Sequence, residues 1–174
     1  MSKINYDLNL IKAFVLDVDG VLSPSTIPTD AEGNPVRMAN IKDGYVLQLA
    51  AKIGYKISII TGANSEVIRK RYNTLGINDV FIGCTRKLEV LQKWMKENSL
   101  QPNEVLYMGD DIPDYEAMQY VGLSCCPADA AHDIKQIAVH ITTKQGGHGC
   151  VREVVEETIR AHKMWMNEKY AFDW

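Results

Sequence analysis

What the sequence has little of excludes several classes of function. It holds 19 basic and 22 acidic residues, so the formal net charge is −3 and there is no positive excess to attract nucleic acid. No apolar run approaches the roughly 20 residues of a membrane span. The opening stretch, MSKINYDLNLIKAF, lacks the apolar core and cleavage site of a secretory signal. These absences predict a cytoplasmic protein without nucleic-acid or membrane partners.

Cysteine is also scarce, and its spacing is uninformative for metal binding. Cys84, Cys125, Cys126 and Cys150 form no C-x-x-C pair, which disfavours a zinc site or a disulfide framework. Buried, reduced thiols are the better interpretation. The 174 residues, 46% of them hydrophobic, suffice for one ordinary domain with its own core. We therefore predict a single domain over 1–174.

What the chain does contain is an alternation of short apolar runs and amphipathic stretches. The apolar runs have strand length and lie at 11–16, 57–60, 80–82, 105–108, 123–126 and 138–141. Helical periodicity occupies 45–53, 65–75, 88–95, 115–120 and 151–166. Such alternation predicts an α/β fold, a doubly wound, Rossmann-like parallel sheet with helices on both faces.

One segment interrupts this alternation. Residues from about 23 to 41 carry three prolines and the turn sequence DAEGNP between STIPT and VRMAN. This pattern predicts a β-hairpin that projects from the core after the first strand, here called the flap (residues 23–41). The C-terminal YAFDW has no helical repeat, and we expect it either to fray or to dock on a partner.

Polar side chains follow four of the predicted strands where each strand ends. In open parallel sheets, ligands bind beyond the carboxyl ends of the strands, so these side chains are expected to converge on one crevice. In chain order they are Asp17 and Asp19, then Thr61 and Gly62, then Lys87, and finally Asp110, Asp111 and Asp114.

The chemistry that such a set supports is narrow. Carboxylates without histidine or cysteine suit a hard cation such as Mg²⁺. One carboxylate can attack phosphorus to form an aspartyl-phosphate, and a second can move the protons. Taken singly, each residue has a common structural explanation, such as a cap or a solvated surface charge. Their order at successive strand ends favours a phosphoryl-transfer site.

These motifs resemble those of a known family. DVDGV at 17–21, ITG at 60–62, Lys87 before a helix and GDDIPD at 109–114 resemble the four motifs of the haloacid dehalogenase-like phosphohydrolases. The resemblance implies that Asp17 is the nucleophile and Asp19 the general acid and base. It assigns the phosphate to Thr61, Gly62 and Lys87. It places Mg²⁺ on the Asp17 carboxylate, the Asp19 backbone carbonyl and the Asp110 carboxylate, with Asp111 or, preferably, Asp114 in the outer shell.

The spacing of the motifs bears on the substrate. The segments from Asp19 to Thr61 and from Thr61 to Lys87 are too short for a cap domain, so a neighbouring subunit is expected to cover the site. The flap, KDG at 42–44 and GGHGCVREV at 146–154 resemble the subgroup that hydrolyses 3-deoxy-D-manno-octulosonate 8-phosphate in lipopolysaccharide sugar synthesis. That resemblance implies a homotetramer.

A sugar-acid substrate requires a cation for its carboxylate. The candidates in the sequence are Arg69, Arg86, His148 and Arg152. Ala63 and His148 stand where members of the subgroup often carry basic residues, which leaves a nine-carbon keto-sugar acid 9-phosphate as an alternative substrate. A non-catalytic, haloacid dehalogenase-like assembly module is a further alternative. It is disfavoured because Asp17, Asp19 and Lys87 are all present.

Overall fold

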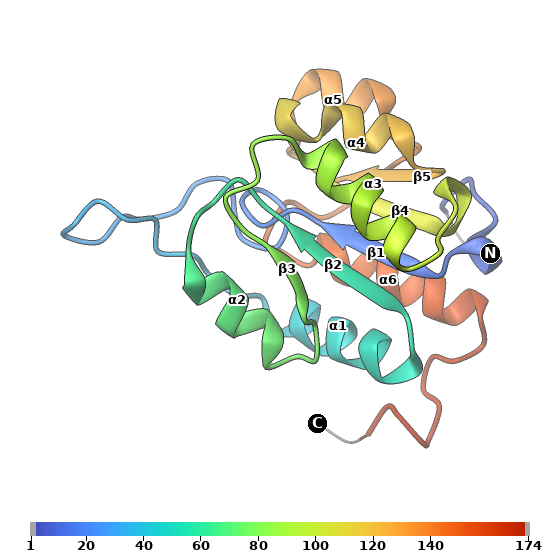
Figure 1. Ribbon diagram of the computed structural model, residues 1–174. Helices are drawn as coiled ribbons and strands as arrows, with labels where there is room; N and C mark the ends of the chain where they lie inside the picture. Colours follow the sequence, from blue (N-terminus) through green and yellow to red (C-terminus); the bar gives the residue numbers. More distant parts are fainter. Residues whose placement is uncertain (1–2, 173–174) are drawn as a thin grey trace.

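Six strands pair in parallel in the order β3-β2-β1-β4-β5-β6 (Figure 1). The structure is a computed structural model that describes residues 3–172. The strands are β1 (Ala13–Leu16), β2 (Lys56–Ile60), β3 (Asp79–Phe81), β4 (Val105–Met108), β5 (Leu123–Cys126) and β6 (His140–Ile141). Because β1 pairs with both β2 and β4, it lies inside the sheet, and Asp17 follows at its carboxyl end. The predicted α/β fold is confirmed.

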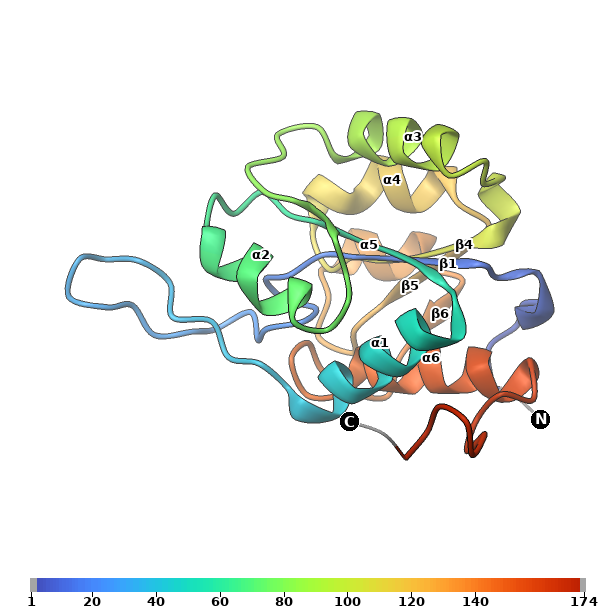
Figure 2. The ribbon, with the colours of Figure 1, turned by 60° about the horizontal axis from the view of Figure 1, so that its bottom comes forward.

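Six α-helices cover the two faces of this sheet. They are α1 (Ile41–Ile53), α2 (Glu66–Asn73), α3 (Lys87–Glu97), α4 (Tyr115–Tyr120), α5 (His132–Ile137) and α6 (Cys150–Ala161). Helices α1, α2 and α6 lie on one face, and α3, α4 and α5 lie on the other (Figures 1 and 2). None of the helices described is long and apolar enough to cross a membrane.

The alternation of side chains along β1 divides the core in two. Phe14 and Leu16 belong to the cluster under α1 and α6, whereas Ala13 and Val15 belong to the cluster under α3 and α4. All four side chains are fully buried. A parallel sheet covered on both faces requires this continuous apolar run, since successive strand residues point to opposite faces.

Two helices differ from expectation. The periodic stretch 151–166 yields a helix that ends at Ala161, because the backbone turns to positive φ at Lys163 and Met166 (58° and 60°). Helix α5 was not predicted; with only His132–Ile137 it is too short to establish a helical period in the sequence.

The flap projects away from the sheet between β1 and α1 (Figure 1). It turns at Asp30, whose carboxylate accepts hydrogen bonds from the backbone N–H groups of Glu32 and Asn34, and it closes with one antiparallel bridge between Thr29 and Pro35. The predicted hairpin therefore forms as a turn and a single bridge, without a regular strand pair. Its prolines lack the N–H groups that a longer ladder would need.

The C-terminal segment packs against its own chain, near α1 and α6 (Figure 2). The Tyr45 hydroxyl donates to the carbonyl of Ala171 at 2.7 Å, and Ala171 is buried. The expectation that this tail frays is therefore wrong for Ala171, whereas docking of the exposed Phe172 on a partner stays a prediction. Positions 173 and 174 of the YAFDW stretch lie outside the described residues.

Candidate active site

An open cleft of about 680 Å³ lies at the carboxyl ends of β1, β2 and β4. Its lining brings together the residues that the sequence places after four strands, although they span almost a hundred positions of the chain. They are Asp17, Asp19, Thr61, Gly62, Lys87, Asp110, Asp111 and Asp114. The parallel sheet gathers them because all its strands end at the same edge.

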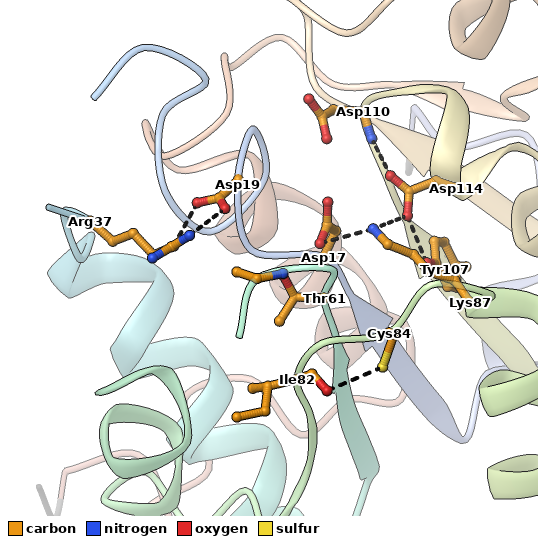
Figure 3. Close-up of polar contacts among 11 residues, drawn as sticks. Asp17, Asp19, Arg37, Thr61, Ile82, Cys84, Lys87, Tyr107, Asp110 and Asp114 are labelled. Carbon is orange, nitrogen blue, oxygen red and sulfur yellow. Dashed lines mark hydrogen bonds and ion pairs between the residues drawn. The ribbon is translucent and has the colours of Figure 1, made fainter. Parts of the chain in front are cut away.

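Lys87 links the first and last motifs (Figure 3). As the first residue of α3 it reaches into the cleft, where Nζ lies 3.0 Å from Asp17 Oδ1 and 2.8 Å from Asp114 Oδ1. Burial opposes its charge, but the two carboxylates more than offset this, so the pKa of Lys87 is raised. The lysine is therefore a fixed positive charge beside Asp17.

Asp114 organises the floor of the cleft with both of its oxygens. Oδ1 accepts from Lys87 and from the Tyr107 hydroxyl at 2.7 Å, and Oδ2 accepts from the backbone N–H of Asp110 at 3.2 Å. Burial raises the pKa of Tyr107 well above its usual value, so the phenol stays protonated and donates. Sequence reasoning missed Tyr107, whose only signal was a hydroxyl-bearing side chain inside the apolar β4.

Three carboxylates could hold a cation. Oxygens of Asp17, Asp110 and Asp114 lie within 4.8 Å of one another. Burial, and then repulsion from Asp17 and Asp114, raises the pKa of Asp110 to about 8. Burial and the charge of Asp114 likewise raise the pKa of Asp17. A hard divalent cation fits this set, because it would remove the repulsion that disfavours the charged forms.

The two candidates for the outer shell differ in their surroundings. Asp111 is exposed, and its carboxylate accepts from the backbone N–H of Ile112 at 2.8 Å, which caps the short 3-10 turn there. Asp114 is buried among the acids of the cleft. The geometry therefore favours Asp114 over Asp111.

Glycine is required where the loop after β1 passes under Asp110. Gly20 has φ +85°, and a Cβ there would lie 1.9 Å from Asp110 Oδ2. A Cβ on Gly146 would lie 1.9 Å from the Gly20 carbonyl oxygen. Any side chain at Gly20 would displace a carboxylate of the acidic cluster, and the loop at Gly146 holds the Gly20 segment from behind.

Comparison with known proteins identifies the family of the chain. The profile of the haloacid dehalogenase-like hydrolases matches residues 72–154. The 3-deoxy-D-manno-octulosonate 8-phosphate phosphatase KdsC of Escherichia coli K12 is 36% identical over 146 residues, which cover 84% of this chain and 78% of that protein. The chain belongs to the haloacid dehalogenase-like family.

Solved structures of other family members have the same fold. A 3-deoxy-D-manno-octulosonate 8-phosphate phosphatase from Moraxella catarrhalis, in complex with magnesium, phosphate and KDO, superposes with a TM-score of 0.89 at 32% identity, over 96% of each chain. The corresponding phosphatase from Yersinia pestis has a TM-score of 0.88 at 32% identity, over 92% of this chain and 87% of its own.

Thr61 of this haloacid dehalogenase-like protein lies at the end of β2 with its backbone fixed. Its N–H donates to the Phe81 carbonyl at 3.0 Å, and its carbonyl accepts from Cys84 at 2.9 Å. Oγ1 accepts from the N–H of Ala63 at 3.2 Å. Since a hydroxyl that accepts still carries its own proton, Thr61 can donate to an anion in the cleft.

Asp19 is engaged by a residue that sequence reasoning missed. Arg37, from the flap, donates through Nε to Oδ1 at 2.8 Å and through Nη2 to Oδ2 at 2.7 Å (Figure 3). A lone arginine in a loop carries no spacing signal, so only the folded chain reveals this pair.

The four candidates for the substrate carboxylate are not among the residues that line the cleft. Arg69 is paired with Glu66, and Arg86 is paired with Glu89 at 2.9 Å. Within the described chain, His148 is exposed on the loop at 146–149, here called the glycine loop. The guanidinium of Arg152 lies over the ring of Trp165, 4.6 Å from its centroid, and over Tyr45. No one of the four reaches the cleft within this chain.

The two sequence stretches KDG and GGHGCVREV meet in space. Asp43 Oδ1 accepts from the backbone N–H of Arg152 at 2.6 Å, and Asn40 Nδ2 donates to the carbonyl of Gly147 at 3.1 Å. Burial raises the pKa of Asp43 to about 6, against the lowering effect of the N–H groups of Arg152 and Gly149. Asp43 therefore ties the start of α1 to the start of α6 and supports the glycine loop that backs Gly20.

Proposed function

We propose that the protein is a Mg²⁺-dependent phosphatase that hydrolyses 3-deoxy-D-manno-octulosonate 8-phosphate to KDO and phosphate, in lipopolysaccharide sugar synthesis. The observation that supports this most directly is the buried Asp17, held 3.0 Å from Lys87 beside two further carboxylates. The choice of substrate is supported by the E. coli and M. catarrhalis relatives, both of which are named as phosphatases of this compound.

Asp17 would act as the nucleophile. Its carboxylate attacks phosphorus, the sugar oxygen leaves, and an aspartyl-phosphate forms on Asp17. Lys87 holds the attacking carboxylate and, with Thr61 and the backbone N–H of Gly62, donates to the phosphoryl oxygens as charge shifts onto them. Asp114 in turn holds Lys87 in this position.

Asp19 would move the protons. It gives a proton to the departing sugar oxygen and then removes one from the water that attacks the aspartyl-phosphate. Release of phosphate returns Asp17 to its free carboxylate.

The Mg²⁺ ligands would be the carboxylates of Asp17 and Asp110 and the backbone carbonyl of Asp19, with Asp114 in the outer shell. The cation supplies positive charge that lets an anionic nucleophile approach an anionic phosphate. The chain holds these carboxylates close enough together to bind one cation. Gly20 contributes because it has no side chain to displace the Asp110 carboxylate.

The substrate is tested by phosphate release across a panel. The panel contains the eight-carbon acid 8-phosphate, a nine-carbon keto-sugar acid 9-phosphate, and sugar phosphates without a carboxylate. We expect the eight-carbon compound to have the highest kcat/KM. It should exceed the sugar phosphates without a carboxylate by about tenfold or more, because one charge-assisted contact to a carboxylate contributes that much. The nine-carbon compound is the alternative substrate suggested by Ala63 and His148. A higher kcat/KM for it than for the eight-carbon compound would reassign the substrate. No turnover of any compound would favour a non-catalytic assembly module.

Mg²⁺ should stabilise the protein more at pH 8 than at pH 5. The raised pKa values of Asp17 and Asp110 mean that the folded, metal-free protein holds protons that the unfolded chain has already released. Its stability therefore falls as the pH rises from about 4 towards 8, and the deprotonated acids bind Mg²⁺ most tightly at the upper end. At a Mg²⁺ concentration of about 100 Kd, we expect Tm at pH 8 to rise by roughly 5 to 10 °C.

The measurement is thermal unfolding at both pH values, with Mg²⁺ and with a chelator. Asp110→Asn is the matched variant, and it should lose most of the shift at pH 8. An equal shift at pH 5 and pH 8 would contradict the proposed ligand set.

The proposal extends to assembly and location. A homotetramer in which the flaps pack together is supported by apolar side chains on and beside the flap, with Val36 exposed to 47%, Met38 to 52% and Ile41 to 68%. A cytoplasmic location is supported by the four cysteines, all of them free. In such an assembly the domain would act without a cap domain of its own.

A further inference from the structure

Arg37 forms a two-point ion pair with Asp19, which lines the cleft, although Arg37 itself is not among the lining residues (Figure 3). The flap arginine uses Nε and Nη2 on the two carboxylate oxygens, at 2.8 and 2.7 Å. The Arg37 side chain is only 18% exposed, although it belongs to a projecting loop. This parallel geometry is the one in which guanidinium recognises a carboxylate most selectively.

The backbone around Arg37 is fastened to the same loop that carries Asp19. Met38 donates through its N–H to Ser23 Oγ at 3.2 Å, and Val36 donates to the Pro28 carbonyl at 2.8 Å. Ser23 is buried and bridges to Asp19. The backbone of Arg37 is thus held next to the loop that carries Asp19, and its long side chain can turn from Asp19 to another anion.

The pair with Arg37 fixes the direction in which the Asp19 carboxylate points. Both oxygens accept from Arg37, so the pair keeps the Asp19 carboxylate turned towards the guanidinium, although each oxygen keeps a further lone pair (Figure 3). Once the pair opens, the carboxylate can turn towards the leaving oxygen and take up from solvent the proton that it then donates. Opening leaves a guanidinium beside the cleft that needs another anion, since a partly buried charge is costly without a partner.

We propose that Arg37 recognises a carboxylate on the substrate, and that this substrate carboxylate takes the place of Asp19 on the guanidinium and releases Asp19 for proton transfer. The inference rests on the proposed function and deepens it, because it names the group that distinguishes a sugar acid from other phosphate esters. The Asp19 carboxylate makes the contact with Arg37 that the substrate carboxylate would make. Arg37 acts here as a residue of binding and positioning.

The test compares two substrates that share one leaving group: 3-deoxy-D-manno-octulosonate 8-phosphate and its C1 methyl ester. In Arg37→Gln, kcat/KM for the acid should fall by about 10- to 100-fold, because a two-point charged contact is lost. The kcat/KM for the ester should rise by about two- to fivefold, the factor that a partly exposed pair contributes, because Asp19 is no longer held. Arg37→Lys keeps the positive charge but cannot donate to both carboxylate oxygens at once. Its kcat/KM for the acid should therefore lie between those of Arg37→Gln and wild type.

Lys42→Gln is the matched control, since it removes an exposed cation at the start of α1 and should match wild type on both substrates. If kcat/KM of Arg37→Gln falls equally for the acid and the ester, the role of Arg37 is merely structural and the inference is overturned. An unchanged kcat/KM for both substrates, or a rise for both, would overturn it as well. Wild-type protein that hydrolyses neither compound would refute the phosphatase itself. Melting curves of each variant confirm that the fold is retained.

Discussion

Asp17→Asn is expected to reduce phosphate release by a factor of about 10⁴ or more, because an amide oxygen cannot form the aspartyl-phosphate. Asparagine nearly matches aspartate in shape, and Lys87 should keep Asp114 as a partner, which it contacts at 2.8 Å in the wild-type chain. The wild-type acid has a raised pKa because it is buried near Asp114, so its neutralisation relieves repulsion. The Tm of the metal-free variant should therefore be no lower than that of wild type.

Phosphate release and the melting temperature together separate chemistry from folding. Acid-quenched wild-type enzyme should carry a phosphate adduct on Asp17, and Asp17→Asn should carry none. Asp133→Asn, an exposed aspartate in the first turn of α5, is the control and should behave as wild type. Turnover by Asp17→Asn within tenfold of wild type would sink the assignment of the nucleophile.

Lys87→Met is expected to have the largest effect on stability. Lys87 is 5% exposed and lies within 3.0 Å of both Asp17 and Asp114, so its removal leaves buried carboxylates without a counter-charge. Breaking a buried ion pair from one side typically costs about 3 to 5 kcal/mol of unfolding free energy. Phosphate release should also fall to background, since the group that orients Asp17 is lost.

The loss of stability in Lys87→Met should depend on pH in a defined direction. Lys87 lowers the pKa values of Asp17 and Asp110, so both rise further in the variant. An acid whose folded pKa lies above its unfolded value destabilises the fold as the pH rises through that interval. The deficit against wild type should thus be smaller at pH 5 than at pH 8.

Denaturant unfolding of the metal-free proteins at both pH values measures this difference. Lys93→Met, which removes an exposed lysine from the same helix, should change the unfolding free energy little at either pH. A deficit for Lys87→Met that grows as the pH falls would contradict the role of Lys87 as the counter-charge of the acidic cluster.

The sequence alone was sufficient for features that depend on neighbours along the chain. The apolar runs that became β1, β2 and β4 were visible because a strand buried on both faces needs an unbroken apolar stretch. The approach of Asp17, Asp110 and Lys87 to one another was predictable as well, since each directly follows a strand or begins a helix at the same sheet edge.

Tertiary structure alone decided which side chains face one another across loops. The contact of Arg37 with Asp19 and that of Tyr107 with Asp114 depend on the path of the flap and on the packing of β4, which no periodicity records. The C-terminal tail likewise found its place through the Tyr45 hydroxyl. The positions of the strand ends can be predicted from the apolar pattern along the chain. The partner of a long, flexible side chain cannot, because it depends on which charged groups the fold brings near.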